Sequence, residues 1–194
     1  METKLFKSKE ESRKAYKEYV EEHIKAVQTC FKLYGMNIIK FITKESNRFI
    51  ISSNSELYEM VDKLVSVHDR SKFSPEEFDA YAAKFKRSKE DSVDDEKIES
   101  DFNKAWVHHY TNNRHHPEYW FINKKNSYMP ITSLIEMILD WISMSYVFKS
   151  SLYDWWFNNA SGREEKVKMI DIKDIELIDK FIKYNKAELD FSNK

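Results

Sequence analysis

The sequence predicts an all-α protein. Only two Gly and three Pro occur among its 194 residues, far below their usual shares of about 7% and 5%. The chain therefore has few turn-formers and few helix breakers. Apolar residues recur at intervals of three to five over long stretches, which is the spacing of amphipathic helices. We expect long helices joined by short polar links.

The N-terminal part of the chain predicts one long helix, a less regular segment and a second helix. Apolar and aromatic residues keep helical spacing over residues 8–34, and Gly35 stands where such a helix would end. Residues 37–53 contain two β-prone clusters and predict a small hairpin or a loop. Helical spacing returns over residues 55–68.

The clearest helix start is Ser74-Pro75-Glu76-Glu77. It offers an N-cap Ser, a Pro at the first helical position and a Glu three residues after the cap, so it predicts a helix over residues 75–87. A polar connection follows over residues 86–97. The remaining pattern predicts helices over 95–113, from Pro130 to about Phe148 and over 172–187, with the aromatic stretch 153–157 continuing or capping the second of these.

Composition and charge exclude several classes of protein. Hydrophobic residues make up 41% and charged residues 34%, which is typical of a soluble globular chain. A net charge of -1 argues against nucleic acid or a membrane as a partner, while leaving a local basic patch open. The lone Cys30 excludes an internal disulfide and a cysteine zinc site. With no predicted membrane span or signal peptide, we expect a cytoplasmic protein.

The six histidines fall at three places: His23, His68, and a cluster at His108, His109, His115 and His116. Taken alone, His23 is more often a structural residue than a ligand. At the end of an apolar helix, however, His68 and Asp69 can converge on one cation. Seven residues of helix rise about 10.5 Å, so two histidines of the cluster on one helical stripe cannot share an ion. They serve two ions, the chain breaks near Asn113, or some of them only form hydrogen bonds.

The order His23, then His68-Asp69, then Asp140 resembles the H…HD…D pattern of the HD superfamily of metal-dependent phosphohydrolases. Residues 64–72 are similar to that family's apolar helix ending in HD-x-x-K. The resemblance covers about residues 15–150. It implies an HD-domain-like helical bundle forming a single domain over residues 1–194, with residues 151–194 as a C-terminal helical extension.

Two longer motifs look like an uncharacterised family found in bacteria and phages. They are His-Asp-x-Ser-Lys-Phe-Ser-x-Glu-Glu-Phe at residues 68–78 and His-His-Pro-Glu-Tyr-Trp at residues 115–120. The sequence departs from the HD pattern at Ser71, where Gly is usual. It also lacks the Glu that follows HD closely in the single-metal nucleotidase branch, so the resemblance favours a multi-histidine relative.

The resemblance implies a role for each candidate site residue. One or two divalent ions (Mn, Mg, Fe, Ni or Zn) would be held by His23, His68, Asp69 and Asp140. His109, His115 and His116 would bind a second ion or give a proton to the leaving oxygen. Lys72 and Arg114 would clamp phosphate, with a solvated charge as the alternative for each. Glu136 would support a ligand or a bound water, or would simply be an exposed helix charge.

The predicted function is hydrolysis of a nucleotide or another small phosphate ester by metal-activated water. The same resemblance leaves two alternatives. One is a di-iron oxygenase of the HD type, and the other is a non-catalytic HD-fold module that binds a nucleotide or a host protein.

Overall fold

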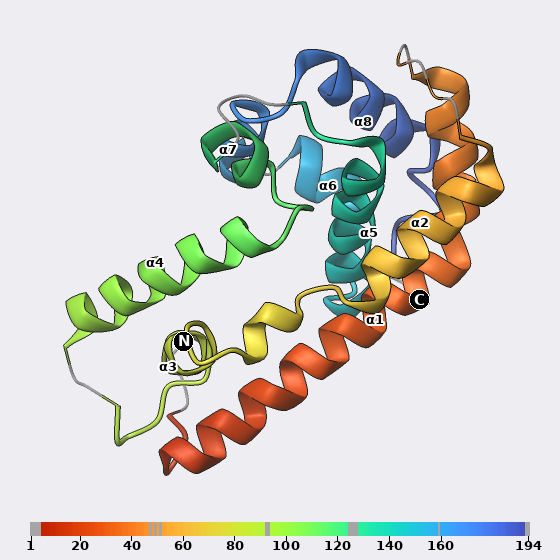
Figure 1. The fold of residues 1–194 in the computed structure, drawn as a ribbon. Coiled ribbons are helices and arrows are strands. Elements are labelled where there is room, and N and C mark those ends of the chain that lie inside the picture. Colours follow the sequence, from red (N-terminus) through yellow and green to blue (C-terminus); the bar gives the residue numbers. More distant parts are fainter. Residues whose placement is uncertain are drawn as a thin grey trace. The chain divides into compact units, whose positions relative to one another are not determined.

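The computed structural model describes residues 5–46, 48, 50, 52–91, 94–123, 128–158 and 160–192. The helices are α1 (Lys9–Glu45), α2 (Asn54–Ser66), α3 (Phe78–Phe85), α4 (Asp95–Asn112), α5 (Ile131–Val147), α6 (Leu152–Phe157), α7 (Ala160–Val167) and α8 (Ile172–Tyr184), with a 3-10 turn η1 at Arg70–Phe73 and a π-helical turn η2 at Tyr119–Asn123. Among these residues, β-type pairing is limited to two isolated bridges. The all-α prediction is confirmed (Figure 1).

The chain divides into two compact units. The first comprises Met1–Glu22 and Asp69–Asn113, and the second comprises His23–His68 and Arg114–Lys194. Helix α1 continues without a break across the first boundary. The single HD-like domain expected over residues 1–194 stays a prediction, since compactness does not say which parts fold independently.

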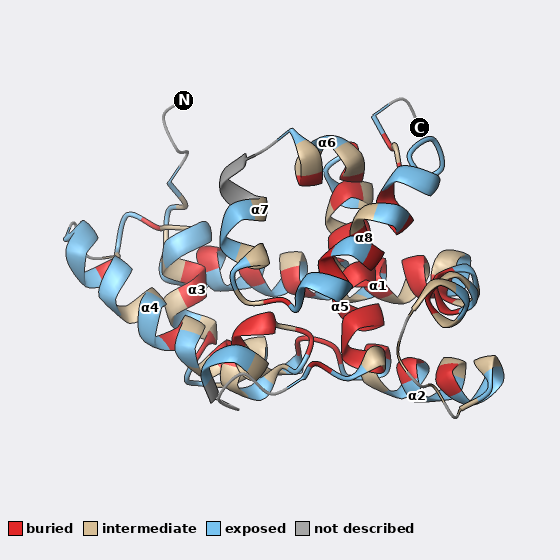
Figure 2. Cartoon of the chain, turned by 90° about the horizontal axis from the view of Figure 1, so that it is seen from above, coloured by how far each residue is buried: buried red, intermediate tan, exposed pale blue. Residues whose placement is uncertain are grey.

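Helix α5 is central to the core of the second unit. Every residue from Thr132 to Leu139 is buried, as are Trp141 and Ile142 (Figure 2). Apolar side chains of α1, α2, α6 and α8 and of the residues that follow α8 pack into the same core. As predicted, the helix begins next to Pro130: its first residue is Ile131, and Pro130 is the N-cap residue. The polar residues that α5 carries are therefore held on a rigid, buried element.

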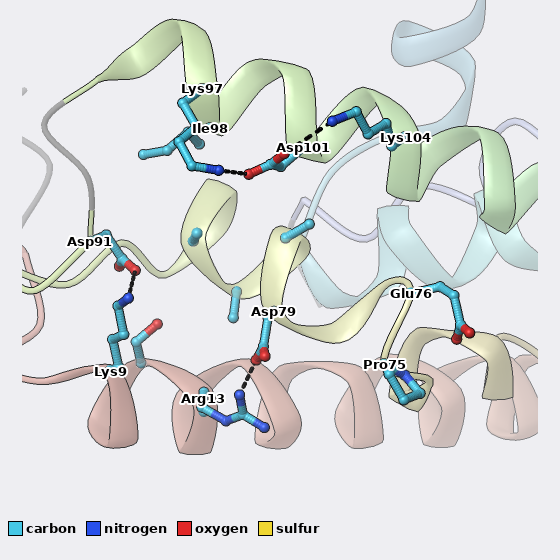
Figure 3. Close-up of a pocket in the computed structure, with 14 residues that line it drawn as sticks. Lys9, Arg13, Pro75, Glu76, Asp79, Asp91, Lys97, Ile98, Asp101 and Lys104 are labelled. Carbon is cyan, nitrogen blue, oxygen red and sulfur yellow. Dashed lines mark hydrogen bonds and ion pairs between the residues drawn. The ribbon is translucent and has the colours of Figure 1, made fainter.

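The first unit has a smaller core, built on aromatic rings. Tyr16 of α1 and Tyr81 of α3 are both buried, and Tyr81 packs edge-on against Phe102 of α4. A cavity of about 460 Å³ opens in this unit (Figure 3). Its charged side chains pair with one another, as Arg13 does with Asp79, and none of the predicted site residues is among those that line it.

The predicted helix end at Gly35 and the predicted hairpin or loop over residues 37–45 are wrong. Helix α1 does not end at Gly35 but runs to Glu45, so residues 37–45 form neither a hairpin nor a loop. Ile38, Ile39 and Ile42 continue the helical spacing of Phe31, and all are buried in the core. Burial of that stripe outweighs their β propensity. The second β-prone cluster, at residues 49–52, lies partly outside the described residues.

The helix expected at residue 75 begins later, at Phe78. Ser74 is the C-cap residue of η1 rather than an N-cap, and residues 75–77 form a turn. The side chain of Glu77 is completely buried instead of capping the helix. Helices α2, α4, α5 and α8 lie close to their predicted bounds, α6 is a separate helix, and α7 was not predicted.

Within the described residues, no helix is both long enough and apolar enough to cross a bilayer.

Candidate metal centre

Three elements of the second unit bring His23, His68 and Asp140 together. His23 lies on α1, His68 follows the end of α2, and Asp140 lies on α5. Oδ1 of Asp140 is 3.2 Å from Nε2 of His23 and 3.7 Å from Nε2 of His68. One ligand atom from each residue lies within 4.8 Å of the other two. Two imidazoles and a carboxylate at this separation are a donor set for a transition metal ion.

The state of Asp140 fits such an ion. Its Oδ1 atom is buried and accepts no hydrogen bond from the described residues, although two imidazole nitrogens approach it. A buried carboxylate oxygen normally accepts a hydrogen bond, because burial without one is costly. The arrangement is therefore compatible with these donors sharing a cation.

Glu136 contacts the ring nitrogen of His68 that does not face Asp140. It lies one helical turn before Asp140 on α5, and its Oε1 atom accepts a hydrogen bond of 3.0 Å from Nδ1 of His68. The other ring nitrogen, Nε2, faces Asp140, and in the neutral imidazole with Nδ1 protonated it carries the lone pair that can bind a metal. A carboxylate that orients a metal-binding histidine in this way is a common feature of metal sites.

His115 extends the same cluster. Its Nδ1 atom is 3.5 Å from Oε1 of Glu136, and its ring lies 4.3 Å from the ring of His68. His68, His115 and Glu136 also offer ligand atoms within 4.8 Å of one another. The cluster thus contains three imidazoles around two carboxylates.

The imidazoles keep both carboxylates ionised. Burial alone would raise the pKa of Glu136, but contacts with His115 and His68 outweigh it and lower the pKa to about 2. Burial likewise opposes ionisation of Asp140, yet His23 and His68 hold its pKa well below the ordinary value. Two buried negative charges require positive charge beside them, which protonated imidazoles or a bound cation can supply.

Asp69 belongs to the first unit, where it contacts His109 and Lys72. Its backbone is left-handed, with φ of 55°, a conformation that Asp tolerates better than most residues. Oδ1 of Asp69 is 3.3 Å from Nε2 of His109, and Oδ2 is 2.6 Å from Nζ of Lys72. The charge of Lys72, predicted to clamp phosphate, is thus engaged by a carboxylate in this structure.

Glu77 is the residue that the sequence reasoning missed. Its two carboxylate oxygens contact two adjacent histidines of α4: Oε1 is 2.7 Å from Nδ1 of His108, and Oε2 is 2.8 Å from Nδ1 of His109. The His109–Glu77 pair therefore repeats the arrangement of His68 and Glu136. Glu77 falls within the motif at residues 68–78, but that motif suggested a helix cap rather than a partner for histidine.

These contacts shift the pKa values of both members of the buried pair. Burial would raise the pKa of Glu77, but His109 overcomes that effect and lowers it. Burial would lower the pKa of His109, but Asp69 and Glu77 raise it. Glu77 and His109 therefore form an ion pair. Each charge reduces the free-energy cost of burying the other.

His116 lies beside His115, and Arg114 is at the surface. The ring of His116 is 4.2 Å from that of His115, and its Nδ1 atom is 4.0 Å from Oε2 of Glu118. Arg114 is exposed, and its guanidinium lies 5.9 Å from the ring centre of Tyr119.

Of the four predicted metal ligands, the structure brings three together: His23, His68 and Asp140. The role of Asp69 as a fourth ligand stays a prediction, as do the catalytic roles of Lys72, His109, Arg114, His115 and His116.

Comparison with known proteins identifies a family for this chain but gives no activity. No curated protein and no solved structure matches the chain. A family model matches residues 12–183. This range contains all six histidines and four of the acids that contact them, Asp69, Glu77, Glu136 and Asp140. The chain therefore belongs to the family of unknown function DUF5662.

Proposed function

We propose that this protein is a metal-dependent phosphohydrolase that acts on a nucleotide or another small phosphate ester. The observation that carries the proposal is the shared approach of His23 and His68 to Asp140, with Glu136 orienting His68. The class of reaction is supported by the H…HD…D order of the sequence. Neither the family description nor a named relative contributes to it.

In this proposal each residue has a distinct task. A divalent ion, when bound, supplies Lewis-acid chemistry that activates water and offsets charge developing on phosphorus. His23, His68 and Asp140 hold that ion, and Glu136 fixes the orientation of His68. Asp69, which directly follows His68 in the chain, is the fourth ligand predicted from the sequence.

The remaining candidates bind a second ion or handle the substrate. His109, His115 and His116 are proposed as ligands of that ion or as proton donors to the leaving oxygen. Arg114 is exposed and is proposed to bind phosphate, since it forms no ion pair with an acid among the described residues. Lys72 can do so only by exchanging its contact with Asp69 for one with phosphate.

The test combines metal analysis with an activity screen. The purified chain is analysed for Mn, Mg, Fe, Ni and Zn and is then assayed on nucleotides and simple phosphate esters. We expect one or two metal equivalents and a hydrolytic activity that His68→Ala and Asp140→Ala each reduce by at least about a hundredfold. Glu59→Gln, which removes an exposed acid of α2, should leave both properties unchanged. Full activity after the metal has been stripped would refute the proposal.

One observation favours a second candidate. Two histidines and one carboxylate are also the donor set that holds iron in non-haem oxygenases, and His68, His115 and Glu136 offer ligand atoms beside it for a second ion. Redox-active iron without phosphatase activity would support a di-iron oxygenase of the HD type. A well-folded protein that binds no metal would instead support a non-catalytic binding module.

A further inference from the structure

A groove of about 820 Å³ lies in the second unit between the C-terminal part of α1 and α8. The α1 side is one helical stripe, and the α8 side continues into the residues that follow the helix. Four lysines line the groove against two glutamates, so its lining is net positive. The lysines are Lys40, Lys44, Lys180 and Lys183.

Two of the four positive charges, those of Lys40 and Lys180, are available to a ligand. Lys40 and Lys180 are exposed, and neither forms an ion pair with an acid in the part of the chain that the structure describes. Lys183 lies over the ring of Phe157, and Lys44 is near Glu45. The cavity of the first unit differs, because its cations are paired with acids across its walls (Figure 3).

The groove also presents an open aromatic ring. Tyr184 is 81% exposed, more than any other large hydrophobic side chain in the described ranges. Its ring centre is 5.8 Å from that of Phe41, and Phe41 in turn packs edge-on against the buried Phe181. The tyrosine ring therefore rests on the core while remaining open to solvent, which makes it a platform for stacking.

We propose that this groove binds single-stranded nucleic acid, with its phosphates on the lysines and a base stacked on Tyr184. A basic groove that contains an exposed aromatic ring is the usual means of holding an unpaired strand. Lys40 and Lys44 are one turn apart, about 6 Å along α1, which is comparable to the spacing of successive phosphates in an extended strand. A duplex keeps its bases stacked and could not use the ring, and a concave surface suits a strand better than a flat membrane.

The groove is separate from the candidate metal centre. Along α1, Phe41 lies about 27 Å from His23, because each residue of an α-helix rises 1.5 Å. Strand binding therefore does not rest on the proposed hydrolysis, and either can fail without the other. The near-neutral charge of the whole chain does not oppose it, since a strand responds to the local potential.

The test is fluorescence anisotropy of a labelled oligothymidylate of about ten nucleotides. We expect saturable binding at low salt. The double variant Lys40→Gln/Lys180→Gln should weaken it about tenfold and lower the slope of log affinity against log salt by about 1.4, because two phosphate contacts are lost. Tyr184→Ala should weaken binding roughly tenfold and leave the salt slope unchanged.

The matched control is Lys25→Gln/Lys32→Gln. It removes two exposed lysines from the same helix but outside the groove, and should leave binding unchanged. Three results would overturn the proposal: no binding at low salt, equal affinity for a duplex of the same length, or an equal loss in the control variant. Binding of phosphatidylserine vesicles without binding of the strand would make the groove a membrane contact instead.

Discussion

The two ring nitrogens of His68 have different partners: Nδ1 donates to Glu136 and Nε2 faces Asp140. Replacing Glu136 should therefore weaken metal binding without removing a ligand. We expect Glu136→Gln, which can still accept the hydrogen bond, to lower the affinity about tenfold, and Glu136→Ala about a hundredfold. Calorimetric titration with Mn²⁺ or Zn²⁺ measures both. Glu59→Gln is the control, and an unchanged affinity in the alanine variant would rule out the orienting role.

Glu77 provides a second prediction at the level of single residues. Its buried carboxylate satisfies His108 and His109 together, whereas an amide oxygen can serve only one of them fully. Glu77→Gln should lower the free energy of unfolding by about 1–3 kcal/mol. Urea denaturation measures this. Glu18→Gln, at an exposed position of α1 in the same unit, should change nothing, and equal stability of the two variants would contradict the account.

The sequence singled out the three residues that lie together better than it singled out the carboxylates beside them. His68 stood out at the end of an apolar helix, whereas His23 and Asp140 joined it only through the resemblance to the H…HD…D order. Glu136 was one of many acids on helices, and Glu77 stood in a motif that also reads as a capping box. Only the packing of α3 on α4 aligns Glu77 with two histidines 31 and 32 residues further along the chain.

Among the elements, α1 shows where local propensity misleads. Glycine and a run of isoleucines suggest a helix end followed by a strand. The periodicity of Phe31, Ile38 and Ile42 instead describes one continuous buried stripe. Propensities differ by about 1 kcal/mol or less per residue, whereas burying each such side chain contributes about 1.5–3 kcal/mol. Packing therefore decides the conformation.

Gly35 has a packing role that can be tested in the same element. A Cβ atom at this position would lie 2.5 Å from the ring of Phe31, which is itself buried. Gly35→Ala should therefore destabilise the protein by about 1–3 kcal/mol, even though alanine gains about 1 kcal/mol in helix propensity. Asn37→Ala, at an exposed site of the same helix, should be neutral or slightly stabilising. If Gly35→Ala were more stable than the wild type, the ring of Phe31 could shift away from the new Cβ atom without loss of packing, and the prediction would be wrong.

At the scale of the whole molecule, the all-α class followed from composition, but the two units did not. The first unit is assembled from two separate stretches of chain, and its first boundary falls inside α1, between Glu22 and His23. Composition marks a boundary only where a linker rich in Gly, Pro or Ser interrupts the pattern. An uninterrupted helix leaves no such mark, so only tertiary contacts reveal the division.

The buried carboxyl of Asp174 makes the stability of the molecule depend on pH. Asp174 of α8 is paired with Arg48, but burial outweighs the guanidinium and raises the pKa of Asp174 to about 6. Since the unfolded chain loses this proton near pH 4, the unfolded state binds fewer protons between about pH 4 and pH 6. Protonated Asp174 therefore stabilises the folded state below pH 4. As the pH rises to about 6 this stabilisation is lost, which lowers the free energy of unfolding by about 2–3 kcal/mol. Above that range both states are ionised and the contribution is constant.

Urea denaturation of the wild type and of Asp174→Asn across this range isolates the contribution. Asparagine cannot ionise, so the difference in unfolding free energy between the two proteins should shift by about 2–3 kcal/mol in favour of the variant between pH 4 and pH 6.5. Asp62→Asn, at an exposed site of α2, should track the wild type at every pH. A difference that stays constant with pH would contradict this account. It would mean that Asp174 is ionised throughout the range, so that the Arg48 guanidinium rather than burial sets its pKa.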